Sequence, residues 1–283
     1  MKIGTIESIW RYPVKGMAGE SLGACALDSQ GLAGDRTWAV QDVKRQEIQS
    51  CKFRPQLLQC RARTRGELDS EHIEITFPGG QTLRSDHPQV NAQVSALIGH
   101  ESVLQPLRAD AGDDFYRRYK TDDHTWLDEL KATFAREEGE PLPDLDNLPK
   151  SMQEFVSVRG TFFLVSQFHI LTTASLDYMK QQNPEADWHL ERFRPNLMIE
   201  TLPGIEGLAE QDWIGKTLQI GELRIECDGP APRCGAVTRQ QSDFGADTGL
   251  LRSIVRHADQ NLGIYGNVRN SGLISVGDEV VLI

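Results

Sequence analysis

The sequence lacks the hallmarks of several protein classes. It contains no run of about 18 apolar residues, the length that a membrane-spanning helix requires. The stretch from Met1 to Ile6 alternates and has no apolar core of the kind found in signal peptides, so we expect a cytoplasmic protein. None of the five cysteines forms a C-x-x-C pair, which argues against a disulfide framework and against a structural zinc site.

Basic charge is also scarce. Lysine and arginine total 30 against 41 aspartates and glutamates, and the net charge of −11 makes the chain a poor candidate for binding nucleic acid. A single basic pocket for a small anion stays compatible with this balance. No P-loop or G-x-G-x-x-G motif is present, the histidines lack metal-ligand spacing, and we interpret His169 as a residue at the edge of the core.

The pattern of apolar and turn residues predicts a mainly β fold with peripheral helices, built as two packed β-barrel-like domains. We expect an N-terminal β-barrel domain over residues 1–108, an acidic, proline-rich connection over 109–155 and a second domain over 156–283. The expected strands are Ile3–Trp10, Thr37–Asp42, Ile73–Phe77, Phe162–Val165, Leu197–Glu200, Thr217–Ile220, Leu223–Cys227, Val280–Ile283 and a closing pair around Asn261–Val268 and Gly272–Val280. The expected helices are Pro88–Ile98, His124–Arg136, Ile170–Gln182 and Thr248–Ala258.

One cysteine stands in an unusual setting. Cys234 follows Pro230 and Pro232, which predict a stiff loop, and Arg233 beside it favours the thiolate over the thiol. A thiolate on a rigid, electropositive loop is a nucleophile or a metal ligand. The alternative is a small buried apolar residue at the start of a strand, because free cysteines are often buried.

Several polar residues have the chemistry of an anion site. Arg192 and Arg194 are spaced to lie on one face of an extended chain, with Asn196 beyond Pro195, and this set suits a phosphate and a heteroaromatic edge. Lys15 is expected at the end of the first strand, before a tight turn at Gly16, and Arg36 stands in a glycine-punctuated turn that opens a strand. Three hydroxyl residues stand at a predicted helix start, where free amides bind anions, and these are Thr172, Thr173 and Ser175. Each feature also has an ordinary interpretation as a solvated cation, an ion pair or a helix cap.

In combination, these segments resemble the MOSC family, whose domain is named after the C-terminal region of molybdenum-cofactor sulfurases. The first half resembles the N-terminal β-barrel domain of that family through Tyr12-Pro13-Val14-Lys15 and Gly34-Asp35-Arg36-x-Trp38. The second half resembles the MOSC domain through Leu171–Leu176, Phe193-Arg194-Pro195-Asn196 and Arg233-Cys234. The resemblance covers nearly the whole chain and extends to mitochondrial amidoxime-reducing components and bacterial reductases of N-hydroxylated bases.

The resemblance implies a molybdenum-cofactor-dependent oxidoreductase that reduces N-hydroxylated compounds. Cys234 would be the catalytic residue and the molybdenum ligand. The pterin and its phosphate would be held by Lys15, Arg36, Thr172, Thr173, Ser175, Arg192, Arg194, Asn196 and Arg233. The alternative is a carrier of the cofactor, or of sulfur on Cys234, without catalysis.

Two further expectations concern partners and specificity. No ferredoxin-like cysteine cluster follows the MOSC-like region, so a separate ferredoxin- or flavoprotein-like protein would supply electrons. We expect neither a nucleic acid nor a membrane as a partner. Gly16 stands where many relatives carry serine, and the Gly235-Ala236-Val237-Thr238 segment differs from the mitochondrial enzymes, which affects the substrate pocket.

Overall fold

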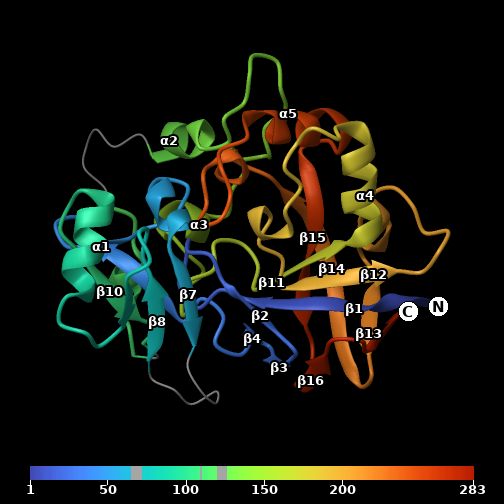
Figure 1. Ribbon diagram of the computed structural model, residues 1–283, viewed down its shortest axis with the longest axis horizontal. Coiled ribbons are helices and arrows are strands. Elements are labelled where there is room, and N and C mark those ends of the chain that lie inside the picture. Colours follow the sequence, from blue (N-terminus) through green and yellow to red (C-terminus); the bar gives the residue numbers. More distant parts are fainter. Residues whose placement is uncertain (65–71, 109, 120–125) are drawn as a thin grey trace.

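The computed structural model describes residues 1–64, 72–108, 110–119 and 126–283. It shows two β-rich units side by side, with the long first strand running into the unit formed by the C-terminal half (Figure 1). The predicted class, mainly β with peripheral helices, is confirmed. The architecture is a closed barrel with further sheets beside it.

In the described part of the chain, seven strands close the barrel in the order β12-β11-β15-β14-β13-β17-β1, and β1 pairs back onto β12. The strand β2 extends the sheet at β1, and the β11–β12 pair is parallel whereas the other pairs are antiparallel. The bounds are β1 Lys2–Arg11, β2 Glu20–Leu22, β11 Phe168–Thr172, β12 Leu197–Thr201, β13 Thr217–Ile220, β14 Leu223–Pro232, β15 Asn261–Val268 and β17 Glu279–Leu282.

Three buried isoleucines explain why β1 joins this barrel, and shifts in its pairing register accompany their spacing of three residues. Ile3, Ile6 and Ile9 are fully or almost fully buried in the barrel core with Ile199 and Ile264. Fully burying one such side chain stabilises the fold by about 1.5–3 kcal/mol. The predicted first strand therefore contributes to a core that is formed mostly by strands more than 150 residues further along the chain, together with Leu27 and Leu32.

The remaining N-terminal strands form a second unit around its own core, which includes Val14, Val40 and Leu57. Its sheets are β10-β5-β6 and β7-β8-β9, and α1 packs on β10. The bounds are β5 Trp38–Asp42, β6 Glu47–Ile48, β7 Arg61–Thr64, β8 Ile73–Thr76, β9 Thr82–Arg84, β10 Ser102–Pro106 and α1 Val90–Ile98. A small sheet, β16-β3-β4, consists of β3 Ala24–Asp28, β4 Gly31–Leu32 and β16 Gly272–Ser275.

Helices α4 (Thr173–Gln182) and α5 (Thr248–His257) lie on the C-terminal side of the molecule and bury Met179 and Ile254 in a shared core (Figure 1). The connection carries α2 (Trp126–Ala132) and α3 (Lys150–Glu154). Of the helix predicted at His124–Arg136, residues 124 and 125 lie outside the described residues, and α2 ends at Ala132. None of the described helices is long and apolar enough to cross a membrane.

Three local predictions were wrong. Phe162–Val165 is an irregular segment whose aromatic side chains are buried, because burial alone does not require strand pairing. Residues 170–172 belong to strand β11, and the helix begins only at Thr173. The segment at Gly272 does not pair with β15; it pairs with β3 of the N-terminal half.

The predicted boundaries at residues 108 and 155 stay a prediction. One observation bears on how the parts interact. Strand β1, which we assigned to the N-terminal domain, pairs with β12 and β17 of the C-terminal barrel. The first strand of the chain therefore belongs to the barrel formed by the C-terminal half, and the chain passes from it into the second unit.

Glu210 ties three barrel elements together. Its side chain is fully buried in a short 3-10 turn, Ala209–Trp213, and accepts hydrogen bonds from the Thr172 hydroxyl (2.6 Å), the Ser175 hydroxyl and the Gly263 amide (3.2 Å). Burial raises the pKa of this carboxyl. The carboxylate thus connects the start of α4 with strand β15.

We expect Glu210→Ala to lower the free energy of unfolding by at least about 1–3 kcal/mol, because buried donors lose their acceptor. Urea denaturation followed by circular dichroism measures the effect. Glu206→Ala, on an exposed position nearby, is the matched control and is expected to change stability by less than about 0.5 kcal/mol. Equal stability of the two variants would show that the buried carboxylate contributes nothing.

Candidate functional site

A cavity of about 540 Å³ lies where the barrel meets the N-terminal unit and the connection. We call it the central cavity. Seven of the residues selected from the sequence line it, and these are Lys15, Arg36, Arg192, Arg194, Asn196, Arg233 and Cys234. They come from positions up to 219 residues apart, so the fold gathers a set that the sequence shows only as scattered segments.

The central cavity is basic although the protein is acidic. Its described lining contains seven lysines and arginines but only two aspartates, Asp144 and Asp228, in a chain of net charge −11. A concave site lined by one sign of charge raises the local concentration of ligands of the opposite sign. The lining therefore favours an anionic ligand.

Cys234 is held at this cavity by backbone contacts on both sides. The Arg233 amide donates to the Gln260 carbonyl (2.8 Å) and the Gly235 amide to the Thr133 carbonyl (2.9 Å). A Cβ on residue 235 would come within 3.0 Å of the Thr133 carbonyl oxygen, so glycine permits this close approach. The thiol is half-buried and belongs to a segment with little freedom to move.

The segment before Cys234 differs from the expected loop. Strand β14 continues through Pro230 and Pro232, which face Ile264 and Asn261 of β15. The pairing register shifts on both sides of Pro230, and irregular pairing is where a strand tolerates a residue without an amide hydrogen. The prolines therefore stiffen the end of a barrel strand that leads directly to the cysteine.

Asp35 positions two of the predicted ligand-binding residues. Its buried carboxylate accepts from the Tyr12 amide (2.7 Å), from the Asn196 side chain (2.8 Å) and from Arg36. Arg36 also donates to the Asn196 side-chain oxygen at 3.2 Å. Asp35 therefore binds a backbone amide and orients Arg36.

Arg194 reaches the cavity by a route that the sequence did not predict. Its φ of +57° is left-handed, whereas we expected an extended residue before Pro195. The reason is a short 3-10 turn, Leu190–Arg192, after which the chain reverses. The guanidinium lies 4.3 Å from the centre of the Tyr12 ring and donates to the Met17 carbonyl, and its burial lowers its pKa.

Arg192 and Arg194 consequently have different hydrogen-bond partners. The buried Arg192 donates to the carbonyls of Val237 (3.2 Å), Arg239 (3.1 Å) and Gly245 (2.6 Å) and pairs with Asp187. Both terminal nitrogens are thus committed to the chain that follows Cys234. Arg192 also lines the central cavity and its buried Nε atom has no partner among the described residues, so its predicted role in cofactor binding stays a prediction beside this positioning role.

Arg233 retains capacity for a ligand. One terminal nitrogen donates to the Phe193 carbonyl at 2.7 Å, but the buried Nε atom has no partner among the described residues. Leaving a buried donor unpaired costs about 1–3 kcal/mol, and more when the group is charged. An acceptor bound in the central cavity would remove this cost.

Lys15 is not a solvated lysine. It is 7% exposed, its ammonium group donates to the Val156 carbonyl at 3.2 Å, and burial lowers its pKa to about 7. Its backbone amide donates to the Trp38 carbonyl, which fixes the turn at Gly16 beside the cavity. A nearby anion would stabilise the protonated amine.

The three residues at the start of α4 are not brought to the cavity. Thr172 and Ser175 direct their hydroxyls to Glu210, and Thr172 also caps the Ser175 amide at 3.1 Å. Thr173 donates to or accepts from Thr201 and lines a different cavity. We therefore withdraw the assignment of all three to cofactor binding; the helix-cap interpretation holds.

The structure adds cavity residues that the sequence did not suggest, namely Cys51, Lys52, Arg118, Phe163 and Tyr265. Burial raises the pKa of the Cys51 thiol, and Cys234 adds to this effect while Arg194 opposes it. His169 lies on β11 at the core edge, as predicted, but it also lines the cavity, and burial lowers its pKa to about 3. No local motif marks these positions, because they enter through tertiary packing.

Known proteins with similar sequences cover most of the chain. The chain is 32% identical over 278 residues to molybdenum cofactor sulfurase 2 of Culex quinquefasciatus, covering 92% of this chain and 34% of that protein. It is 25% identical to the molybdenum cofactor sulfurase of Drosophila erecta, covering 90% of this chain and 30% of that protein. The chain thus spans about a third of the length of these relatives.

Among solved structures, the YuaD protein from Bacillus subtilis is similar with a TM-score of 0.47 and 12% identity, covering 99% of this chain and 95% of that chain. The family model of the MOSC N-terminal β-barrel domain matches residues 3–119, and that of the MOSC domain matches residues 158–281. The predicted resemblance is confirmed in both halves. The chain belongs to the MOSC family and combines the MOSC domain with the N-terminal β-barrel domain of that family.

Proposed function

We propose that this protein binds a molybdenum cofactor in the central cavity, with Cys234 as a metal ligand, and reduces N-hydroxylated compounds. The observation that carries the proposal is the position of a half-buried thiol in a basic cavity that contains a buried, unpartnered arginine nitrogen. A thiolate is the kind of soft, anionic ligand that molybdenum chemistry favours. The sulfurase names of the relatives support the association with this cofactor.

The residues present fit such a cofactor. Arg36, Arg194 and Arg233 offer guanidinium groups for a phosphate or a pterin edge, and Asn196 holds Arg36 in place. Lys15 would add an ammonium group whose charge the anion stabilises. Arg192 would hold the chain beyond Cys234 from behind.

When bound, the cofactor would supply a two-electron redox centre. Reduction of an N-hydroxyl group breaks one N–O bond, consumes two electrons and two protons, and releases water. The chain would contribute orientation, exclusion of water and cations that stabilise negative charge. We propose that a separate ferredoxin- or flavoprotein-like protein in the cytoplasm supplies the electrons.

A carrier function is the second candidate. The sulfurase names of the relatives favour it, since transfer of sulfur or cofactor would also use a cysteine in a cofactor-binding cavity. Such a carrier would bind the same group but would not turn over a small substrate. Metal content and turnover must therefore be measured separately.

The first prediction concerns metal content. Protein from a host that makes the cofactor is expected to contain close to one molybdenum per chain, and Cys234→Ala to lose most of it, because the thiolate ligand is gone. Cys51→Ala is the matched control, since it removes another thiol from the same cavity. Metal analysis and pterin fluorescence measure the outcome. Equal molybdenum in both variants would exclude Cys234 as the ligand.

The second prediction concerns catalysis. Protein loaded with molybdenum and given a reduced viologen dye is expected to convert benzamidoxime to benzamidine, and Cys234→Ala is expected to be inactive. Chromatography of the product measures the rate. A fully loaded protein without turnover would contradict the reductase and support the carrier.

The third prediction concerns pH. In the ligand-free protein Lys15 loses its proton near pH 7, so binding of an anion above this pH must be accompanied by proton uptake. Affinity for sulfate is expected to fall by up to about tenfold per pH unit between pH 7 and 9. Calorimetry checks this, with Lys15→Arg as the permanently charged control, whose pH dependence should be weaker. Identical profiles would remove Lys15 from the anion site.

A further inference from the structure

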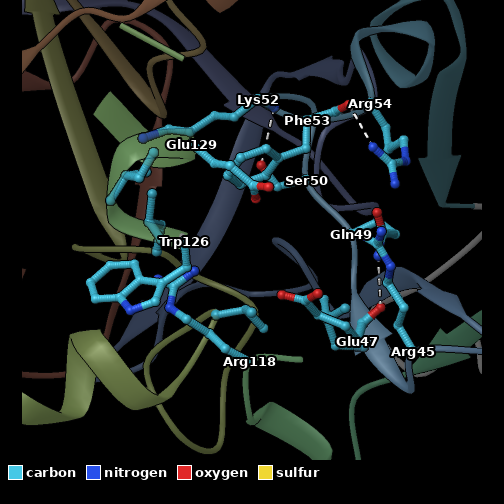
Figure 2. A pocket seen from close by; sticks show the side chains of 14 residues that line it. Arg45, Glu47, Gln49, Ser50, Lys52, Phe53, Arg54, Arg118, Trp126 and Glu129 are labelled. Atoms are coloured by element: carbon cyan, nitrogen blue, oxygen red, sulfur yellow. Dashed lines mark hydrogen bonds between the residues drawn. The ribbon is translucent and has the colours of Figure 1, made fainter. Parts of the chain in front are cut away.

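A second cavity, of about 300 Å³, adjoins the central cavity. We call it the side cavity. The two share Ser50, Lys52, Arg118, Leu130 and Leu164 in their linings. Figure 2 shows the side cavity between Trp126 and Arg118 on one side, Arg45 and Glu47 on another, and Lys52 and Phe53 on a third. A ligand in the central cavity can therefore extend into it.

The side cavity has an excess of positive charge. Its described lining contains the cations Arg45, Lys52, Arg54 and Arg118 and the carboxylates Glu47 and Glu129. Arg54 is engaged by His100 at 3.0 Å, and the Lys52 ammonium lies 4.9 Å from the centre of the Phe134 ring. Neither contact is to a carboxylate, so four cations against two carboxylates leave an excess of positive charge that favours an acidic group over a neutral or basic one.

Arg118 is the best-placed cation. It is 7% exposed and lines both cavities. One terminal nitrogen donates to the Met152 carbonyl at 3.1 Å, and the guanidinium carbon lies 4.7 Å from the centre of the Trp126 ring. Its buried Nε atom has no partner among the described residues. Burial lowers the pKa of Arg118, and the charge of Glu47 opposes that shift. The unpaired Nε atom is where a bound anion would gain a hydrogen bond.

Aromatic surface completes the side cavity. Trp126 and Phe53 line it, and Arg118 holds the Trp126 ring by a cation–π contact. Aromatic rings of a ligand gain from contact with such side chains. The volume is at the lower end for a ligand site, so the side cavity suits one part of a larger molecule.

We propose that the side cavity binds the acidic end of a planar aromatic substrate, a carboxylate or a phosphate, while the N-hydroxylated group lies in the central cavity near Cys234. This inference rests on the proposed function and specifies its substrate class. Arg118 is the specificity-determining residue. It pairs with the acidic group, and Trp126 and Phe53 contact the ring.

The test compares 4-carboxybenzamidoxime with benzamidoxime in the loaded protein. We expect kcat/KM to favour the acidic substrate by about tenfold, the factor that one hydrogen bond to a charged group supplies. Arg118→Met should bring this ratio close to one. Incomplete loading with the cofactor does not change this ratio of kcat/KM values, because both substrates are measured on the same protein sample.

Arg117→Met is the matched control. The Arg117 side chain is 45% exposed, pairs with Asp114 and is not among the described residues that line either cavity, so the ratio should stay unchanged. If Arg118→Met does not fold, Arg45→Gln at the exposed rim should lower the ratio in the same direction. If the unaltered protein converts both substrates with a kcat/KM ratio near one, the proposed role of the side cavity is wrong, while the proposed reductase activity stands.

A binding experiment separates the two proposals if no turnover occurs. Calorimetry with benzamide, 4-carbamoylbenzoate and 4-carbamoylphenyl phosphate requires no chemistry. Tenfold tighter binding of either acidic probe, lost in Arg118→Met and kept in Arg117→Met, would support the side cavity even if the reductase failed. Whichever of the two acidic probes binds more tightly shows whether the side cavity prefers a carboxylate or a phosphate. Equal affinity for all three probes would overturn the inference.

Discussion

The buried carboxylate of Asp35 is the interaction on which the site depends. It accepts hydrogen bonds from the end of β1 through the Tyr12 amide, from its neighbour Arg36, and from Asn196 at the start of β12. The N-terminal unit and the barrel therefore share one fully satisfied polar centre. Without it, several buried donors would lose their acceptor, and Arg36 would lose the partners that aim it at the cavity.

The Tyr12 ring contacts two guanidinium groups from distant parts of the chain. The guanidinium of Arg36 lies 4.7 Å from the ring centre and that of Arg194 lies 4.3 Å from it. Both residues have left-handed backbone conformations, which cost free energy in residues with a Cβ. Asp35 balances the charge of Arg36, whereas Arg194 has no ion-pair partner among the described residues, so a bound anion would stabilise this pair of cations. The arrangement is thus preorganised for a negative ligand.

The sequence predicts the parts of this structure that depend on local pattern. The strand Thr217–Ile220 and the helix that begins at Thr248 follow from alternation and helical spacing. Cys234 could be selected because it follows two prolines and stands beside an arginine, and Arg194 because it lies in a short segment with Arg192 and Asn196. The roles of Thr172 and Ser175 were missed because Glu210, 35 to 38 residues further on, takes both hydroxyls. Arg118 and Cys51 carry no local signal at all, since only packing brings them to the cavity.

The two units contribute different residues to the site. Cys234 stands at the end of a barrel strand and is fixed by backbone of the barrel and of the connection, whereas Arg45, Lys52 and Phe53 of the side cavity come from the N-terminal unit. Under the proposed substrate class, substitutions in the N-terminal unit would alter which acidic group binds without disturbing the thiol. The reverse does not hold, because Asn196 and Arg194 of the barrel half also position the Arg36 and Tyr12 groups of the other unit. Changes in ligand preference are accordingly easier to obtain from the side cavity than from the shared polar centre at Asp35.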